Sequence, residues 1–427
     1  MSVFSSVLIW FGAGVSIAEI ITGTYFAPLG FAKGFAAILI GHAIGCALLF
    51  LTGVIGAKTQ KTAMQTTALS FGKAGSKFFG LLNAAQLLGW TGIMIYDGSL
   101  CASSIAGGVA GGGVLGGQQN LALWAALAIG LLIVVWILAG VRNLDKLNFC
   151  AALALFGLTI FLCVKVAAAF AGGVAAQNAL SSPAMTELGA VGAGEISGAE
   201  DAAGQALSFG AAIELSAAMP LSWLPVISDY TKDAKRPIAA SLAAALVYFF
   251  VSVWMYAIGM AAAIWTGELA IDVVMIKAGL GFAGLAIVVL STVTTTYLDA
   301  YSAGVSWQSV LPREGAKFYA KAVAIFVAVL GTAGAILFNM DNITDFLYLI
   351  GSVFAPMTAI LLADFFVLRK DSSQKKIDAS RFAVWAAGFA LYQVFLRLDL
   401  PFGATLPAMA ATFALALLTR PKRVGII

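Results

Sequence analysis

Charged residues are scarce in this chain, and their scarcity limits the class of protein. Only 10% of the 427 residues are charged, whereas 61% are hydrophobic. A soluble domain carries roughly a quarter charged residues, and a disordered chain needs low hydrophobicity, so both classes are excluded. A bilayer-spanning helix needs about 20 mostly apolar residues, and the hydrophobic content suffices for twelve of them. The long apolar runs also exclude a membrane β-barrel, whose strands alternate apolar and polar residues.

Histidine and cysteine are also rare, which argues against an enzyme. The single histidine, His42, excludes a His-rich metal site, and the four cysteines lie in apolar runs without metal-ligand spacing. We expect His42 to be a neutral packing residue rather than a proton relay. No phosphate-binding GxxxxGK[ST] motif occurs, so no ATP site and no organic cofactor are expected. The net charge of +4 reflects orientation in the bilayer and indicates neither a nucleic-acid nor an obligate protein partner.

Hydrophobic runs bounded by glycine, proline or charge predict an all-α polytopic membrane protein with twelve transmembrane helices. An acidic segment, 176–205, separates the first five helices from the next five. We therefore expect a first repeat at 1–175, an acidic outer loop and second repeat at 176–368, and two last helices with a short basic tail at 369–427. The predicted helices span 5–27, 33–56, 77–107, 121–141, 147–175, 206–229, 237–264, 280–307, 319–338, 343–368, 380–398 and 402–419.

The distribution of positive charge supports this segmentation. If the N-terminus is cytoplasmic, 20 of the 24 lysines and arginines fall in cytoplasmic loops or the tail. Three (Lys33, Lys277 and Arg397) fall on the opposite side, and Lys165 lies within a span. Positive residues favour the cytoplasmic side, so both termini are expected in the cytoplasm, with the chain in a bacterial-type inner membrane.

Carboxylates occur in the first and sixth predicted helices, which are also the helices predicted to be interrupted. The first contains Ser16 and Glu19 among glycines; the sixth contains Glu214 followed by Pro220 and Pro225. Two prolines five residues apart do not fit an uninterrupted helix. Interrupted helices at matching positions of two halves are typical of inverted-repeat transporters, which bind substrate and ions at the interruptions. The alternative is that glycine and proline only permit close packing.

The third and eighth predicted helices each carry a polar stripe. Asn83, Gln86 and Trp90 share one face of the third helix, where an amide and an indole suit a flat heterocycle, although packing is the commoner role of such an aromatic. Trp223, in the sixth helix, offers a second flat surface, and Asp299 is a further intramembrane carboxylate. The hydroxyls of the eighth helix suit a hard cation such as Na⁺, or bond only to their own helix; they are Ser291, Thr294 and Thr295.

These motifs resemble the nucleobase:cation symporter-1 family over nearly the whole chain, and within it the hydroxymethylpyrimidine permease (CytX-type) subgroup. The resemblance implies a LeuT-type fold of five-plus-five inverted repeats with two extra C-terminal helices. It implies a substrate held between helices one, three, six and eight. The motifs are SIAEI at 16–20, GAKT at 56–59, GW at 89–90, SWLPVISDYTK at 222–232, STVTTTYLDAYSAG at 291–304, and Pro356 with Asp364.

The resemblance also implies roles for individual residues. Trp90 matches the family's stacking tryptophan, Gln86 its neighbouring amide, and Ser222 the helix-six serine of cytosine permeases. Gln86 is one residue further from the tryptophan than in cytosine permeases. Their stacking phenylalanine corresponds to Pro220 here, so Trp223 is its candidate substitute.

The family's sodium site takes helix-eight oxygens at the spacing of Ser291, Thr294 and Thr295. Its helix-one carbonyls correspond to Gly12 and Val15. Some relatives use protons instead, and Glu19 or Glu214 offers a carboxyl group for one.

The sequence therefore predicts a cation symporter that imports a small pyrimidine, most simply hydroxymethylpyrimidine for thiamine salvage. A protonated aminopyrimidine presents a pair of donors that one carboxylate accepts, and Glu19 is favoured for this role because it lies at the helix-one interruption. Glu214 is the other candidate for this carboxylate, or a gate residue. Permeation of cytosine, a purine or thiamine by the same fold is the nearest alternative, and a passive facilitator without ion coupling is another.

Overall fold

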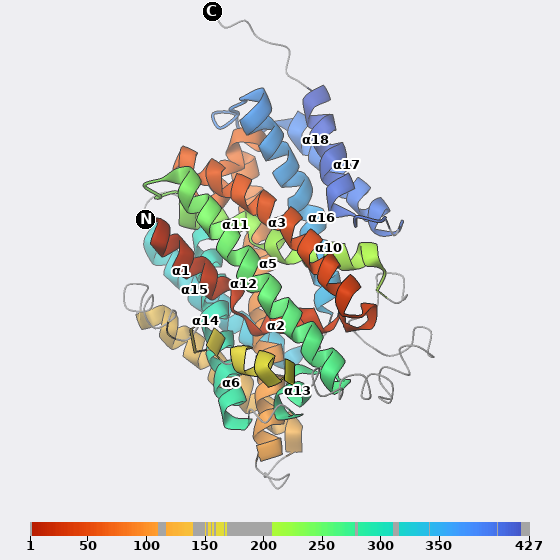
Figure 1. Cartoon of the computed structure of the whole chain (residues 1–427). Coiled ribbons are helices and arrows are strands. Elements are labelled where there is room, and N and C mark those ends of the chain that lie inside the picture. Colours follow the sequence, from red (N-terminus) through yellow and green to blue (C-terminus); the bar gives the residue numbers. More distant parts are fainter. Residues whose placement is uncertain are drawn as a thin grey trace, which may run out of the picture.

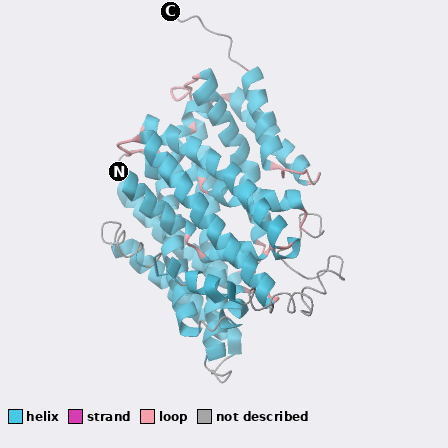
Figure 2. Ribbon diagram, viewed as in Figure 1, coloured by secondary structure: helices cyan, strands magenta, loops and turns pink. Residues whose placement is uncertain are grey.

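The computed structural model describes residues 2–109, 117–139, part of 150–168, 207–277, 281–310, 316–340, 342–398 and 400–419. Within these ranges the regular secondary structure is helical, with no strand (Figure 2). The helices pack side by side (Figure 1), and this all-helical arrangement confirms the predicted class. The predicted loop 176–205, most of the predicted helix 147–175 and the tail beyond residue 419 lie outside the described residues.

Among the described residues up to 139, the chain forms seven helical elements. These are α1 (Val3–Gly14), α2 (Ile17–Thr24), the 3-10 turn η1 (Ala27–Leu29), α3 (Phe31–Thr59), α4 (Ala63–Thr66), α5 (Ala68–Val109) and α6 (Gly117–Ala139).

The second part forms ten elements. These are α10 (Phe209–Ser222), α11 (Leu224–Thr231), α12 (Pro237–Thr266), α13 (Ile271–Lys277), α14 (Gly281–Trp307), α15 (Ala316–Leu337), α16 (Ile343–Leu362), the π-helical η2 (Ala363–Leu368), α17 (Ala379–Leu396) and α18 (Thr405–Leu418).

Several of these helices meet the requirements of a membrane span. Among the described residues, eight are long and apolar enough to cross a bilayer, and the pair α1 and α2, bent by 48°, makes a ninth candidate. The helix predicted at 402–419 is the 14-residue α18, which is shorter than a full span. The chain is therefore an integral, multi-pass membrane protein by length and composition.

The start of the third predicted helix departs from its predicted boundary. The third predicted helix starts at Ala68 rather than at 77, because helical turns continue across a kink at Gly72, whose φ of 78° suits glycine. Backbone atoms of the segment 369–378 bond to this kink: Lys73 N donates to Lys375 O at 3.0 Å, and Asp378 N donates to Phe71 O at 3.0 Å. Hydropathy alone does not show such a docked loop.

Close backbone contact places α2 directly against α12. A Cβ atom at Gly23 would overlap the backbone of Tyr256, and one at Gly259 would overlap the backbone of Ile20. Small residues allow membrane helices to approach this closely. The approach brings Glu19 on α2 beside the polar side chains of α12.

The last two helices, α17 and α18, pack on each other and on α16 at one side of the molecule (Figure 1). A fully buried ion pair joins α17 to η2: Arg381 Nη2 lies 2.6 Å from Asp364 Oδ1, and Arg381 Nε donates to Asp364 Oδ2 at 3.0 Å. The remaining guanidinium nitrogen donates to Ala416 O and to Thr419 Oγ1 on and beside α18. All three elements at this end, η2, α17 and α18, thus share one arginine.

Candidate functional site

The interruption between α1 and α2 exposes backbone groups inside the protein. The N–H of Ile17 donates to Ser291 Oγ on α14 at 3.0 Å, and the N–H of Ala18 donates to Ser16 Oγ at 3.2 Å. In a continuous helix these two donors would bond to the carbonyls of Ala13 and Gly14. Those carbonyls are therefore released from the helical pattern, as the sequence predicted for this helix.

A second interruption lies at Trp223, where α10 ends and α11 begins. The prolines predicted to break this helix flank it, but the two segments bend less than those of the first span. Gln86 Nε2 donates to Ser222 O at 3.1 Å, and Asn83 Nδ2 donates to Pro225 O at 3.0 Å. The amides of α5 thus bind carbonyls around the interruption.

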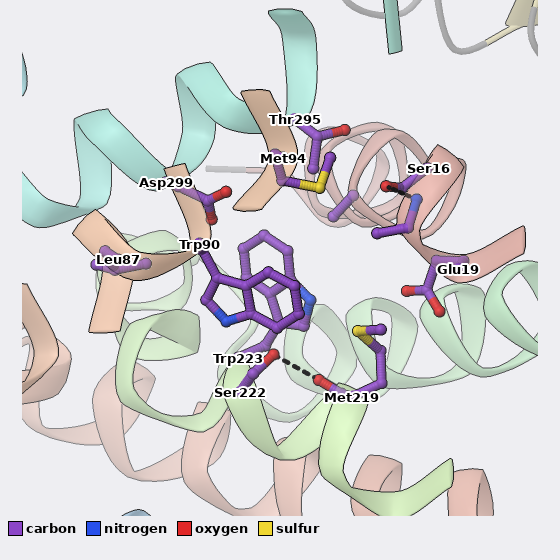
Figure 3. Close-up of a pocket in the computed structure, with 12 residues that line it drawn as sticks. Ser16, Glu19, Leu87, Trp90, Met94, Met219, Ser222, Trp223, Thr295 and Asp299 are labelled. Carbon is purple, nitrogen blue, oxygen red and sulfur yellow. Dashed lines mark hydrogen bonds between the residues drawn. The ribbon is translucent and has the colours of Figure 1, made fainter. Parts of the chain in front are cut away.

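A cavity lies between the two interruptions, α5 and α14. The centre of a water-sized sphere can occupy about 20 Å³ of it. Figure 3 shows Trp90 and Trp223 at its centre, with Asp299 and Glu19 on opposite sides of the two indoles. The residues that line it are Ala13, Ser16, Ala18, Glu19, Leu87, Trp90, Met94, Met219, Ser222, Trp223, Thr295 and Asp299.

The two carboxylates of the cavity differ in their surroundings. Glu19 accepts from Tyr248 Oη at 2.6 Å and from Ser252 Oγ at 2.7 Å, so each of its oxygens has a partner on α12. Asp299 is only 4% exposed. The described residues make no hydrogen bond to its carboxylate, which points into the cavity (Figure 3). An ionised carboxylate has several lone pairs to satisfy, so Asp299 is open to a ligand.

Both indoles are held by edge-to-face contacts. Trp90 packs against Phe346 with ring centroids 5.5 Å apart, and Trp223 packs against Trp10 at 5.6 Å. Trp223 also donates from Nε1 to Tyr248 Oη at 3.0 Å. Both side chains also line the cavity.

The three predicted helix-eight hydroxyls differ in their contacts. Ser291 accepts from Ile17 N, and Thr294 Oγ1 donates to Ser291 O at 3.1 Å. Thr295 lines the cavity, and its buried hydroxyl has no partner among the described residues. Gly12 lies in α1 and Val15 between α1 and α2, so both flank the first interruption. The Ser291 and Thr295 hydroxyls therefore lie at the interruption or in the adjoining cavity, whereas Thr294 bonds within its own helix.

Some predicted site residues lie outside the cavity. Glu214 accepts from Tyr392 Oη, from Thr405 Oγ1 and, at 2.8 Å, from Thr405 N, so it faces α17 and α18. Asn83 bonds to Ser306 Oγ at 2.7 Å as well as to Pro225 O. Neither residue lines the cavity. Charge and polarity inside a span did not indicate which neighbour each side chain meets.

Gln86 lies next to the cavity wall rather than in it. Its Nε2 donates both to Asn83 Oδ1 and to Ser222 O, and Ser222 lines the cavity. Its Oε1 is buried without a partner among the described residues. Ser222 Oγ donates to Met219 O at 2.6 Å. The predicted amide thus keeps one free acceptor.

Sequence reasoning missed the contribution of α12. Tyr248 and Ser252 both bind Glu19, and they stand four residues apart, on one face of the helix. Tyr256 continues the same stripe, and its ring lies edge-on to His42 with centroids 4.7 Å apart. A polar stripe within an otherwise apolar run was the available signal.

Comparison with known proteins identifies the family. Residues 1–413 match the permeases for cytosine/purines, uracil, thiamine and allantoin. The chain belongs to this family. It is therefore a transporter of the nucleobase:cation symporter type rather than an enzyme, and the resemblance of its motifs to the nucleobase:cation symporter-1 family is confirmed. The cytosine permease of Escherichia coli (strain K12) is 24% identical over 351 residues, which cover 82% of this chain and 74% of that protein.

Solved structures share the fold of this family member. Mhp1, a nucleobase-cation-symport-1 family transporter in a closed conformation with bromovinylhydantoin bound, has a TM-score of 0.71 at 19% identity. The match covers 98% of this chain and 91% of Mhp1. A Na⁺-coupled sialic acid symporter has a TM-score of 0.60 at 14% identity, covering 99% and 91% of the two chains. The LeuT-type fold is thus supported at the level of overall architecture.

Proposed function

We propose that this permease is a cation symporter that imports a small pyrimidine by alternating access, with hydroxymethylpyrimidine as its substrate. One observation carries the proposal: the cavity at the two helix interruptions is lined by two indoles and two carboxylates. Indole faces suit a flat ring, and carboxylates suit the donors of an aminopyrimidine. The substrate also follows from the motif resemblance to the hydroxymethylpyrimidine permease subgroup.

In this proposal the substrate ring lies against Trp90 and Trp223. Asp299, whose carboxylate accepts no hydrogen bond from the described residues, takes the paired donors of the protonated ring. The sequence favoured Glu19 for this role, but each of its oxygens already has a partner on α12. Glu19 therefore forms the wall of the cavity opposite Asp299. Ser16, Ser222 and the free Oε1 of Gln86 supply the remaining polar contacts around the ring.

The coupling cation binds beside the first interruption. We assign the carbonyls of Gly12 and Val15 as ligands, as the resemblance implies. The released carbonyls of Ala13 and Gly14 lie between these two residues in sequence, and the bond from Ile17 to Ser291 links this interruption to α14. Thr294 and Thr295 add hydroxyl oxygens. Sodium is the proposed ion because hard oxygen donors suit it, and a proton on Glu19 or Glu214 is the alternative.

The remaining architecture completes the proposal. Twelve spans form two inverted five-helix repeats, at 1–175 and, after the acidic outer loop, within 176–368, followed by two helices and a basic tail at 369–427. The excess of positive charge on one side supports cytoplasmic termini in a bacterial inner membrane. Asn83 in this scheme supports the sixth span through Pro225, and Glu214 secures the last two helices or acts as a gate.

A second candidate substrate is cytosine, because of the similarity to the cytosine permease of Escherichia coli. Purines and thiamine are further members of the family's substrate range. A passive facilitator would use the same cavity without a coupled ion.

A thermal-shift screen of the purified protein tests the proposal. Hydroxymethylpyrimidine, cytosine, a purine and thiamine are each added with and without Na⁺. A ligand at 100 times its Kd stabilises the folded protein by about 2.7 kcal/mol, so the true substrate raises the melting temperature. We expect hydroxymethylpyrimidine to give the largest shift, and Na⁺ to increase it. A larger shift with cytosine would reassign the substrate. Repeating the screen at a second pH completes the test, since shifts that are independent of both Na⁺ and pH would favour the facilitator.

A further inference from the structure

A chain of hydrogen bonds leads from the cavity to the only histidine. Ser252 Oγ lies 2.7 Å from Glu19 Oε2 and 2.6 Å from His42 Nε2. Nδ1 of the same ring lies 2.7 Å from Ser216 Oγ. The four residues come from α2, α12, α3 and α10, and all four are buried. A polar chain this deep in a membrane protein, whose first member lines the substrate cavity, requires a physical account.

The protonation of Nδ1 follows from its neighbours. Ser216 Oγ donates to the carbonyl of Ile38 at 2.8 Å, and a hydroxyl has a single proton. Nδ1 must then be the donor to Ser216 Oγ. Ile38 O also lies 3.1 Å from Nδ1, and a carbonyl oxygen only accepts, which again places a proton on Nδ1. His42 therefore carries a proton on Nδ1, whether the ring is neutral or charged.

The opposite nitrogen, Nε2, shares a proton with Glu19. If Nε2 is bare, Ser252 donates to it, and the contact between Ser252 and Glu19 needs a proton on Glu19. If Nε2 is protonated, it donates to Ser252, and Ser252 donates to an ionised Glu19. Both arrangements satisfy every contact and contain the same number of protons. Without that additional proton, Ser252 would have two acceptors for one hydroxyl proton, and one contact would be lost.

We propose that Glu19, Ser252 and His42 form a proton-binding relay that holds one proton beside the substrate cavity. The proton moves by a balanced double transfer: Glu19 gives its proton to Ser252 Oγ, and Ser252 gives its own proton to His42 Nε2. The reverse transfer restores a neutral pair. Proton occupancy joins α2 to α12 and α3, and proton loss breaks one of these contacts. The relay rests on the proposed symport only for its link to uptake.

The surroundings contain no competing charge among the described residues that contact the relay. Tyr248 donates to Glu19, and the ring of Tyr256 lies beside His42. The thiol of Cys46, on α3, interacts electrostatically with Glu19. Phenol and thiol groups are ordinarily neutral at physiological pH, so Glu19 and His42 are the groups that exchange the proton. Tyr248 also accepts from Trp223 Nε1, which connects the relay to an indole of the cavity.

The single histidine makes the test direct. The full-length protein, without a histidine tag, is labelled with ring-¹⁵N histidine and studied by NMR in nanodiscs, so only His42 gives signals. We expect Nδ1 to remain protonated and the Nε2 signal to shift between about pH 5 and pH 8, where histidine exchanges protons. A bare Nδ1, or an Nε2 signal that does not move, would overturn the relay.

Variants separate the relay from a simple titration of histidine. Glu19→Gln removes the shared proton, because the amide donates to Ser252 and Ser252 donates to Nε2, so the shift is expected to disappear. Ser252→Ala should abolish it and Ser252→Thr should retain it. Ser241→Ala is the matched control, since Ser241 is a buried serine of α12 whose hydroxyl, among the described residues, donates to Pro237 O of its own helix. An unchanged pH response in both Glu19→Gln and Ser252→Ala would contradict the proposal.

The link to uptake is measured separately. Addition of hydroxymethylpyrimidine should change the Nε2 signal in the wild type and leave it unchanged in Ser252→Ala. A pH-dependent signal with no response to this compound or to cytosine would retain the relay and count against pyrimidine transport. Pyrimidine binding together with a static Nε2 signal would retain the proposed function and overturn the relay.

Discussion

The backbone N–H of Ile17 donates to Ser291 Oγ at 3.0 Å, across 274 residues of sequence. This bond fixes the interruption of the first span against α14. It also diverts a donor that would otherwise close the helix, so carbonyl oxygens and hydroxyls lie together. The proposed cation site depends on this relationship.

Removing two hydroxyls from the cation site should uncouple transport. In the double variant Thr294→Ala with Thr295→Ala, we expect the apparent Na⁺ affinity to fall at least about tenfold. Loss of a residue that only supports a metal ligand typically lowers metal affinity by about tenfold or more, and loss of a direct ligand is expected to cost at least as much. Substrate uptake driven by a Na⁺ gradient into proteoliposomes is the measurement. Thr292→Ala, on the same helix but outside the predicted set, is the control. Unchanged Na⁺ dependence in the double variant would refute the site.

Trp90 is expected to supply stacking energy. Ring stacking on an aromatic side chain contributes about 1–3 kcal/mol, so Trp90→Ala should weaken substrate binding roughly 5- to 150-fold, while Trp90→Phe retains part of it. Isothermal titration with hydroxymethylpyrimidine measures the change. Trp124→Phe, at a 67% exposed position on α6, should bind as the wild type does. If Trp90→Ala binds the substrate with the affinity of the wild type, the substrate ring does not stack on Trp90.

Asp299 is expected to recognise the amino group and protonated nitrogen of the ring. A hydrogen bond to a charged group contributes about 1.5–3 kcal/mol, so Asp299→Asn should lower affinity by roughly tenfold or more. The same titration tests this, with Asp345→Asn near the start of α16 as a control. If Asp299→Asn binds normally and Glu19→Gln does not, Glu19 is the recognising carboxylate.

The buried pair of Arg381 and Asp364 should show an asymmetric effect on stability. Arg381→Leu leaves an unpaired buried carboxylate and should reduce the free energy of unfolding by about 3–5 kcal/mol. Adding Asp364→Leu removes that unpaired charge and should restore most of the loss. Chemical denaturation in detergent measures both. A double variant no more stable than Arg381→Leu would contradict this account.

Asp378 should make stability depend on acid pH. Partial burial opposes its ionisation, but hydrogen bonds and charge from Lys370, together with Lys375 and Ser372, lower its pKa to about 2. An unfolded aspartate has a pKa of about 3.9, so the stabilisation is complete above that value and is lost as the pH falls toward 2. Thermal melts at successive pH values should show a smaller acid loss in Asp378→Asn. Parallel curves would exclude this residue as the cause.

Much of the fold followed from the sequence, because membrane burial imposes long apolar runs and places prolines and glycines where helices break. The interruptions at Ser16 and Trp223 are examples. The partners of each polar side chain did not follow, since they depend on how helices rotate against one another. Glu19 and Glu214 look alike in sequence, yet one meets α12 and the cavity, whereas the other meets Tyr392 and Thr405.

The amides of α5 illustrate the same limit. Their spacing with Trp90 correctly predicted a shared helix face. It did not show that Asn83 and Gln86 bind the carbonyls of Pro225 and Ser222. A backbone acceptor released by a helix break leaves no mark in the sequence of the helix that binds it.

Trp223 is the residue that follows the end of α10 and precedes the start of α11, and its side chain lines the cavity. Any swivel of one segment against the other therefore carries this ring with it. Conversely, a molecule that immobilises this ring also restricts the angle between α10 and α11. Binding in the cavity and the geometry of the sixth span are therefore coupled through one side chain.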